Sequence, residues 1–457
     1  MQDSEPPTGP AEGPARSSPT AGSRRTVLRG LGAVSVLGAL GAGGHHLYRA
    51  VRPEVDPRTV IPLYSQTVAY GGDERRILVG ASAPHHELAP SSRLTTAVPA
   101  PAEVVRRARR FWDATAAWRA RVGDDPAPGG SGSLASLAES AIQDLWVLTD
   151  QLPAPVAAWT PHWRYVWPRD AAFCAVALAR IGHAETALDV LEHLQSLQHP
   201  DGWFEARYVP GTERAPDDRP RQFDGTGLLL WAASAVWNSA EASRRGAVAD
   251  RLAPLITTSQ QTLLEATRDG ERMPPISPDY WEVRERSVTL GIMAATLAGL
   301  RGAHTVTGED RAGDAADALT ALLTSTFGAH QYQRYRRGGG ADSARAFFAA
   351  TGCGGIIGTR LLTSLRTELA RGGGGIAPGA SWRDDGISWT PSTSLLALAL
   401  ARAGEHDQAR EVLGWLADHR TEAGSLPEKV LFDGRPAAVA PLAWTAANVL
   451  LAIEALI

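Results

Sequence analysis

The sequence predicts an all-α protein, and more narrowly an (α/α)6 barrel in which six helical hairpins close into a ring with a short N-terminal extension. Two observations indicate this architecture. From about Ala102 onward, apolar residues recur at the 3.6-residue spacing of amphipathic helices, and strand patterns are scarce. Short and long connections then alternate between the predicted helices, which gathers the long ones at one end of an up-and-down array. Loops longer than about 12 residues usually carry function.

The helices are predicted in order from their apolar periodicity, at residues 102–121, 134–150, 170–181, 184–198, 224–243, 247–268, 283–304, 309–327, 343–351, 354–369, 391–403, 405–420 and 441–457. The connections after the odd-numbered helices from the third onward are tight, as at Gly182-His183 and Gly404. Those after the even-numbered helices are long. The first helix therefore lies outside the ring, and the other twelve form its six hairpins.

Two segments precede the barrel, which is predicted over residues 102–457. Residues 1–44 are interpreted as a twin-arginine-type signal, because Ser23 to Arg29 carries the arginine pair and a glycine-rich apolar run follows. That run, about 15 residues long, is shorter than the roughly 20 that a membrane span needs. We expect export to the cell surface or beyond, and an uncleaved leader would tether the chain to a membrane. Residues 45–101 form an extension with short β pieces at Thr59–Ala69 and Arg75–Val79.

Composition excludes several classes of function. A net charge of −4 and scattered arginines give no concentrated basic face for a nucleic acid. Two cysteines, Cys174 and Cys353, cannot form a disulfide framework or a cysteine zinc site, although a single pair between them stays open. We expect neither a cofactor nor a catalytic metal, and the sequence leaves the oligomeric state open.

The segment from Trp163 to Asp170 has the composition of a sugar site. Three large aromatic residues in it can cover the apolar face of a pyranose. The adjacent Arg169 and Asp170 can hold sugar hydroxyls through charge-assisted hydrogen bonds. The alternative is that Asp170 only caps the helix that follows.

Two glutamates in other long loops are candidates for acid–base chemistry. Glu282 follows a proline-stiffened loop and Trp281, and a carboxyl group beside an indole in a partly apolar pocket suits a general acid. The alternative is a first-turn glutamate favoured by the helix dipole. Glu428 follows Pro427 in a loop, with no capping or helical pairing duty. Two carboxyl groups across a sugar-sized gap meet the requirement for cleaving a glycosidic bond.

These motifs resemble glycoside hydrolase family 15, the glucoamylase-type enzymes. Tyr165 to Asp170 is similar to the family's aromatic-x-Trp-x-Arg-Asp segment, Trp281-Glu282 to its general acid, and Leu426-Pro427-Glu428 to its general base. Arg219 to Gly225 is similar to the stretch after the family's second helical pair. The ordered set spans about residues 100–457.

The resemblance implies an exo-acting enzyme that releases glucose from the non-reducing end of α-glucosides with inversion. Glu282 would be the general acid and Glu428 the general base. The implied sugar-binding residues are Trp163, Tyr165, Trp167, Arg169, Asp170, Asp224, Trp281, Arg383, Trp389 and Trp444, with Arg334 as the alternative to Arg383. Trp163 stands where the family often has tyrosine. No starch-binding module follows the barrel, which favours short oligosaccharides.

The sequence leaves other functions open. Within the same family, a trehalase or an α-1,6-glucosidase acting on isomaltose or dextran fits equally well, because the linkage depends on loops without matched motifs. A catalytically silent glycan-binding protein would keep the aromatic site. A terpene cyclase shares the all-α barrel, and Gln198 to Trp203 resembles a triterpene cyclase repeat, but the sequence has no Asp-Asp-x-x-Asp motif.

Overall fold

The computed structural model describes residues 56–80, 87–123 and 133–457. The predicted signal segment lies outside these residues, as does the first part of the predicted extension. The helices are α2 Ala102–Ala114, α3 Ala116–Val122, α4 Leu134–Thr149, α5 Pro168–Arg180, α6 Ala184–Ser196, α7 Asp224–Ser239, α8 Arg245–Arg251, α9 Ala253–Thr267, α10 Leu290–Thr307, α11 Asp310–Thr326, α12 Arg345–Ala350, α13 Thr359–Thr363, α14 Leu365–Glu368, α15 Thr390–Arg402, α16 His406–Asp418 and α17 Ala443–Glu454, with short 3-10 turns η1 Ala242–Arg244 and η2 Gly328–His330.

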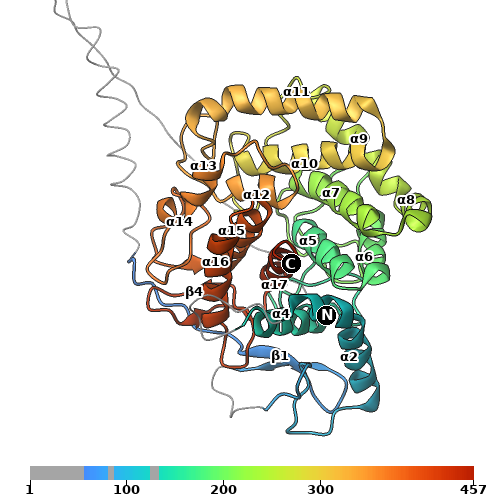
Figure 1. The fold of residues 1–457 in the computed structure, drawn as a ribbon, viewed down its shortest axis with the longest axis vertical. Helices are drawn as coiled ribbons and strands as arrows, with labels where there is room; N and C mark the ends of the chain where they lie inside the picture. Colours follow the sequence, from blue (N-terminus) through green and yellow to red (C-terminus); the bar gives the residue numbers. More distant parts are fainter. Residues whose placement is uncertain (1–55, 81–86, 124–132) are drawn as a thin grey trace, which may run out of the picture. The chain divides into compact units, whose positions relative to one another are not determined.

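Six helices form a closed inner ring, in the order α5, α7, α10, α12, α15 and α17. Each packs on the next, and α17 packs back on α5 (Figure 1). The outer helices alternate with them along the chain: α4, α6, α8 with α9, α11, α13 with α14, and α16. The predicted all-α class and (α/α)6 barrel are therefore confirmed.

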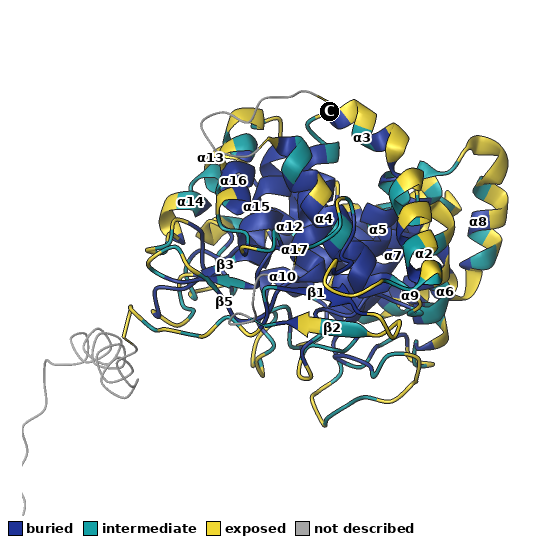
Figure 2. Ribbon diagram, turned by 90° about the horizontal axis from the view of Figure 1, so that it is seen from below, coloured by how far each residue is buried: buried dark blue, intermediate teal, exposed yellow. Residues whose placement is uncertain are grey.

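Burial follows from this ring. Every residue of α17 from Ala443 to Ile453 is buried, because neighbours surround an inner helix on all sides. The outer helix α16 buries one face only, through residues such as Val412 and Leu416, and leaves Asp407, Glu411 and Asp418 exposed (Figure 2). The hydrophobic core lies between the two layers of helices.

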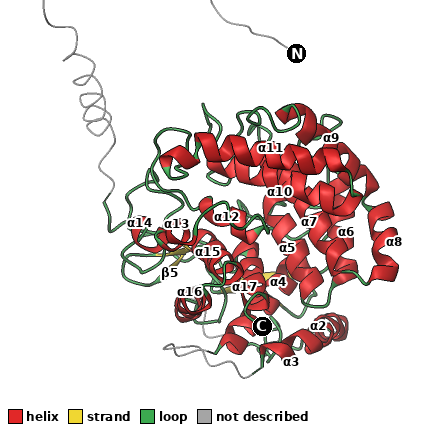
Figure 3. Ribbon diagram, turned by 45° about the horizontal axis from the view of Figure 1, so that its top comes forward, coloured by secondary structure: helices red, strands yellow, loops and turns green. Residues whose placement is uncertain are grey.

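The long loops lie together at the face where the inner helices begin (Figures 2 and 3). Short strands order them there. In one sheet β1 Thr67–Tyr70 pairs with β2 Arg76–Val79, and in a second sheet β4 Lys429–Val430 lies between β3 Ser388–Trp389 and β5 Pro436–Ala437. All these pairings are antiparallel. The second sheet joins the two last long loops of the barrel.

Several predicted elements differ in their boundaries. The helix predicted at 247–268 is divided into α8 and α9, because Pro254 occupies the first turn of α9 and cannot continue a preceding helix. The predicted first and tenth helices are also divided. The helix predicted from residue 283 begins only at Leu290, after Thr289, whose hydroxyl accepts a hydrogen bond from the Ile292 amide at 3.2 Å. This cap leaves Glu282 in the loop.

Other features of the described residues bear on the predictions from composition. Both cysteines, Cys174 and Cys353, are buried and unpaired. No helix in the described part of the chain combines the length and apolar character that a membrane crossing needs. Within the same residues, no group of three or more His, Cys, Asp or Glu side chains is placed to hold a metal ion.

Candidate active site

A cavity of about 600 Å³ opens among the long loops, a size typical of small-molecule sites. The predicted residues that line it are Trp163, Trp167, Arg169, Asp170, Trp281, Glu282, Arg383, Trp389, Glu428 and Trp444. Tyr165 and Asp224 are the predicted residues that do not line it. Tyr165 packs edge-on against Trp167, with 6.1 Å between ring centroids. The fold therefore brings residues from five of the six long loops to one cavity.

Arg169 is the centre of the polar network. It lies in the first turn of α5 and is only 4% exposed. Its guanidinium contacts three carboxylates: Nε lies 3.2 Å from Asp170, Nη1 3.0 Å from Asp224, and Nη2 3.0 Å from Glu282. Burial alone would lower the pKa of Arg169, but the charges of these carboxylates outweigh it and raise the pKa. Arg169 thus orders the floor of the cavity.

The two aspartates beside Arg169 have perturbed ionisation. Burial raises the pKa of Asp170 and that of Asp224 to about 6, and Arg169 opposes this shift only in part. Asp170 does not cap α5, whose N-cap residue is Trp167 and lacks a side-chain capping bond. Asp170 instead accepts a hydrogen bond from Arg169 Nε. The alternative interpretation of Asp170 as a cap is therefore wrong.

Glu282 is held by a side chain of α5 and by two side chains of the loop before α7. Its Oε1 accepts hydrogen bonds from Arg169 Nη2 and Gln222 Nε2, both at 3.0 Å, and its Oε2 accepts one from Arg219 Nη1 at 3.2 Å. The alternative of a first-turn glutamate is excluded, because α10 begins only at Leu290. Indole groups line the cavity as expected, but the two guanidinium groups that contact this carboxylate were not predicted.

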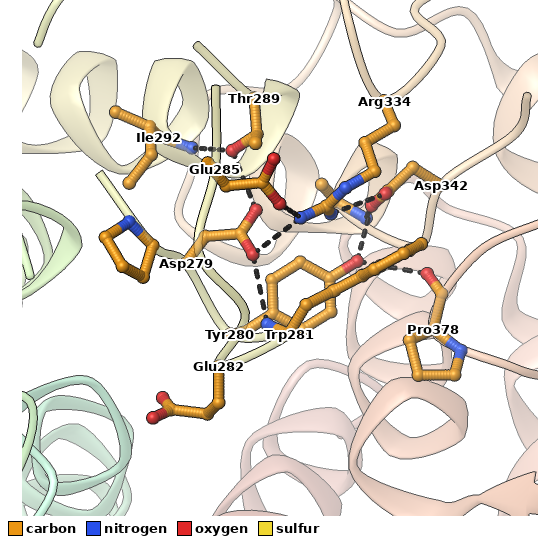
Figure 4. A network of polar contacts seen from close by, with 12 residues as sticks. Asp279, Tyr280, Trp281, Glu282, Glu285, Thr289, Ile292, Arg334, Asp342 and Pro378 are labelled. Atoms are coloured by element: carbon orange, nitrogen blue, oxygen red, sulfur yellow. Dashed lines mark hydrogen bonds and ion pairs between the residues drawn. The ribbon is translucent and has the colours of Figure 1, made fainter. Parts of the chain in front are cut away.

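The backbone at Glu282 is in the left-handed region, with φ of 56°. Non-glycine residues adopt this conformation at a cost that surrounding structure must offset. Asp279 supplies that structure: its carbonyl accepts from the Glu282 amide at 2.8 Å, and its carboxylate accepts from the Trp281 amide at 3.0 Å and from the Thr289 hydroxyl at 2.7 Å. Figure 4 shows the Glu282 side chain on the side of the loop away from this cluster.

Arg334 lies beneath the same loop and does not reach the cavity. It is fully buried, pairs with Asp279, Glu285 and Asp342, and stacks 3.6 Å from the centre of the Trp281 ring (Figure 4). Arg383, by contrast, is exposed and lines the cavity. Of the two arginines that the sequence offered, Arg383 is the one placed to meet a ligand, and Arg334 supports the loop from below.

Glu428 approaches from the last long loop at the edge of the small sheet. Its backbone amide donates to Val439 at 2.8 Å, and its carbonyl accepts from the Thr390 amide at 3.1 Å. One carboxylate oxygen accepts from the Trp163 indole at 3.4 Å, and the other lies 3.3 Å from the Lys429 ammonium. Lys429 in turn lies 4.4 Å from the centre of the Trp389 ring. Strand pairing therefore fixes the position of this carboxylate.

Indole groups form one wall of the cavity. Trp382 packs edge to face against Trp281 and against Trp389, with centroids 4.9 and 5.5 Å apart. The indole N–H groups of these three and of Trp444 are buried without a hydrogen-bond partner among the described residues. Buried donors without partners are costly, so the site has hydrogen-bonding capacity that a ligand can use.

Several lining residues were not among the predicted site residues. They are His162, Arg207, Arg219, Tyr280, Trp382, Asp385 and Lys429, of which Arg219 lies in a motif that the sequence did identify. Trp382 and Lys429 adjoin predicted residues and could have been found by extending the motifs. Arg207 had no comparable signal, because it reaches the cavity through an ion pair with Asp217 and by stacking on Tyr165.

A closed ring of six helical hairpins is the architecture of the glucoamylase-type (α/α)6 barrels. Three solved structures have this fold. A wild-type glycosidase is 20% identical over 71% of this chain and 98% of its own, with a TM-score of 0.59. A glucoamylase from Saccharomycopsis fibuligera is 13% identical over 70% and 94%, with a TM-score of 0.54. A bacterial glucoamylase complexed with acarbose is 15% identical over 70% and 55%, with a TM-score of 0.55.

The sequence comparisons cover much less of the chain than the structural ones. No family model matches the chain. An uncharacterised glycosyl hydrolase of Methanocaldococcus jannaschii is 32% identical over 100 residues, which are 21% of this chain. The match spans only 16% of that relative's length. Because the three solved structures are 20% identical to this chain or less, their likeness establishes the fold alone.

Proposed function

We propose that this protein is a glycoside hydrolase of family 15 that releases glucose from the non-reducing end of α-glucosides with inversion of configuration. The observation that carries the proposal is the meeting of Glu282 and Glu428, from loops far apart in sequence, at one cavity floored by Arg169 and Asp170. Two carboxylates beside a polar sugar cradle suit glycosidic cleavage.

Each group has a distinct task in the proposed reaction. Arg169 and Asp170 hold hydroxyl groups of the terminal glucose, and the indole wall packs on its apolar face. Glu282 donates a proton to the glycosidic oxygen as the bond to the anomeric carbon breaks. Glu428 takes a proton from a water molecule, whose oxygen attacks that carbon from the opposite face and gives β-glucose.

The contacts around the two carboxylates fix their positions at the cavity. Trp163 and Lys429 contact Glu428 and hold it in place. Arg219 is less constrained than Arg169, because its side chain is 41% exposed and it divides its contacts between Asp217 and Glu282. In the proposed cycle Arg219 moves off Glu282 when the leaving sugar binds.

The decisive experiment measures glucose release from maltose, isomaltose, dextran and trehalose, with detection of the anomer formed. We expect β-glucose from at least one of them. Glu282→Gln and Glu428→Gln should each lower kcat by about 10² or more, because each removes the proton transfer that one group supplies. Wild-type turnover in either variant would disprove the assignment. Calorimetric sugar binding without any hydrolysis would instead favour the glycan-binding alternative.

The linkage and the cellular location belong to this proposal too. The substrate that the protein cleaves fastest in this assay decides whether it is an α-1,4-glucosidase, an α-1,6-glucosidase or a trehalase. The arginine pair near the N-terminus is the reason to propose export, and detection of the protein outside the cell by antibody would test it.

A further inference from the structure

A second cavity of about 600 Å³ lies at the other end of the barrel, where the inner helices end. Its charged lining includes Arg180, the last residue of α5, Arg402, the last residue of α15, and Arg301 on α10. Arg169 and Arg180 lie at opposite ends of α5, so the two cavities are separated by roughly 16 Å along the helix axis. This cavity is thus distinct from the candidate active site.

The guanidinium groups of these three arginines lack acidic partners. No hydrogen bond or ion pair to a carboxylate or a carbonyl is made by any of them within the described residues. The buried arginines of the protein are paired with carboxylates, as Arg93 is with Asp144 and Arg345 with Glu368, whereas Arg180 and Arg301 are half-buried and Arg402 is exposed. Arg301 makes a side-chain hydrogen bond to the Cys353 thiol, and none of the three is neutralised by a carboxylate among the described residues. Three arginines from distant parts of the chain therefore present their charges to one cavity, where an anion can meet them.

The acidic groups nearby do not supply that anion. Asp317 is the one carboxylate in the lining, and it is exposed on α11. Glu454 is within electrostatic reach of Arg402, but it accepts hydrogen bonds from the Trp118 indole at 2.5 Å and from Arg121 at 2.8 Å. Arg402 is exposed to solvent at part of its side chain. Desolvation of its guanidinium, followed by the charge of Arg180, lowers the pKa of Arg402 to about 10. The like charges are close enough to disfavour each other.

A simpler role for the arginines would be to cap the negative ends of the inner helices. Capping of that kind places guanidinium N–H groups on the terminal carbonyls. Among the described residues, neither Arg180 nor Arg402 donates to a carbonyl, although each is the last residue of its helix. The helix dipoles therefore favour these two charges without engaging their N–H groups, which leaves the donors free for an anion.

We propose that this cavity binds a phosphate-bearing small molecule, held by the guanidinium groups of Arg180, Arg301 and Arg402. Planar guanidinium groups match the oxygens of a phosphate in a bidentate manner, and more than one of them favours a multiply charged anion. The volume also admits a sugar-sized remainder. Ser234, which is 7% exposed, and Asn238 supply uncharged hydrogen-bonding groups on the α7 side of the cavity.

The proposal is independent of the proposed hydrolase activity and is tested by calorimetry on the full chain. The probes are inorganic phosphate, pyrophosphate and glucose 6-phosphate, with glucose as the uncharged comparison. We expect at least one phosphate compound to bind and its affinity to fall as salt rises, because the contacts are electrostatic. Equal binding of glucose and glucose 6-phosphate, or no binding of any phosphate compound, would overturn the proposal.

Variants locate the binding. Arg180→Gln/Arg402→Gln should weaken it at least about tenfold, whereas Arg109→Gln, which removes an exposed charge on α2, should leave it within about twofold. Should the double variant fail to fold, Arg402→Lys keeps the charge but loses the planar fork, and a clear loss of affinity is still expected. Unchanged affinity in the folded variants would place the phosphate elsewhere and refute the assignment.

Discussion

Asp170 and Asp224 share one guanidinium, and burial raises the pKa of each to about 6. An ordinary aspartate is ionised down to a pH of about 4. Here the charge is lost at higher pH, because the folded protein disfavours the ionised form. Asp170 is therefore mostly ionised only when the pH is above about 6.

This shift predicts the acid side of the pH profile. As pH falls through about 6, Asp170 becomes protonated, its attraction to Arg169 weakens, and kcat/KM for the preferred glucoside should fall. The measurement is kcat/KM as a function of pH in the wild type and in Asp170→Asn. The variant should have a lower value with a weaker dependence in this region. An acid limb centred near pH 4 in the wild type would contradict the prediction.

At the residue scale, the sequence could identify groups whose chemistry is local. Arg169, Asp170, Glu282 and Glu428 stand in short motifs, and the fold brings all four to one cavity. Their partners could not be identified in this way. The hydrogen bond from Arg219 to Glu282 joins residues 63 positions apart, and only the course of two loops determines it.

The loop between α9 and α10 is the element on which the proposed general acid depends. Thr289 does two things there: its hydroxyl caps α10 through the Ile292 amide, and it donates to Asp279, which holds the backbone of Glu282. The Thr289 side chain therefore both stabilises α10 and helps to position Glu282. Ser133 caps α4 through the Ser136 amide and makes no second side-chain contact of this kind with the part of the chain that the structure describes.

Replacing the two caps should separate these contributions. Thr289→Val and Ser133→Ala should each destabilise the protein by about 1 kcal/mol, the usual value of a cap. Only Thr289→Val should also lower kcat, because Asp279 loses one of its hydrogen bonds. Urea unfolding gives the first quantity and glucose release the second. Equal kcat in the two variants would show that the Asp279 network does not position Glu282.

At the element scale, periodicity predicted the helices but not their interruptions. Periodicity predicts each divided helix as continuous, because the apolar spacing continues across the break, as it does across Leu252 between α8 and α9. The strands β3, β4 and β5 have two residues each, which is too short for an alternating pattern to appear. Tertiary contacts decide both features.

For the whole molecule, closure of the ring depends on how closely neighbouring inner helices approach. A Cβ atom at Gly227 on α7 would lie 2.1 Å from the carbonyl oxygen of Ala295 on α10. Gly299 on α10 has the same constraint, since its Cβ would lie 2.7 Å from the Gly227 Cα. Gly227 and Gly299 therefore set how closely α7 and α10 approach each other. The contact lies near the cavity, since α7 begins at Asp224.

Gly227→Ala should therefore destabilise the protein by about 1–3 kcal/mol, as overpacking of a core does. Gly246→Ala is the matched control, because no atom lies within 4 Å of the added Cβ on α8, and alanine favours a helix by about 1 kcal/mol. Urea denaturation of the two variants should give changes of opposite sign. A Gly227→Ala protein as stable as the wild type would show that α7 and α10 can separate without cost.

The ring also determines when the protein can first work. Its last member, α17, docks against α5, whose residues precede it by more than half the barrel's sequence, so closure joins parts of the chain that are synthesised far apart in time. Contacts of such long range form late in folding. A nascent chain that has already emerged with Glu282 and Glu428 has no closed ring until Ala443 to Glu454 follows. The lining of the cavity is likewise incomplete until then, because α17 contributes Trp444 to it.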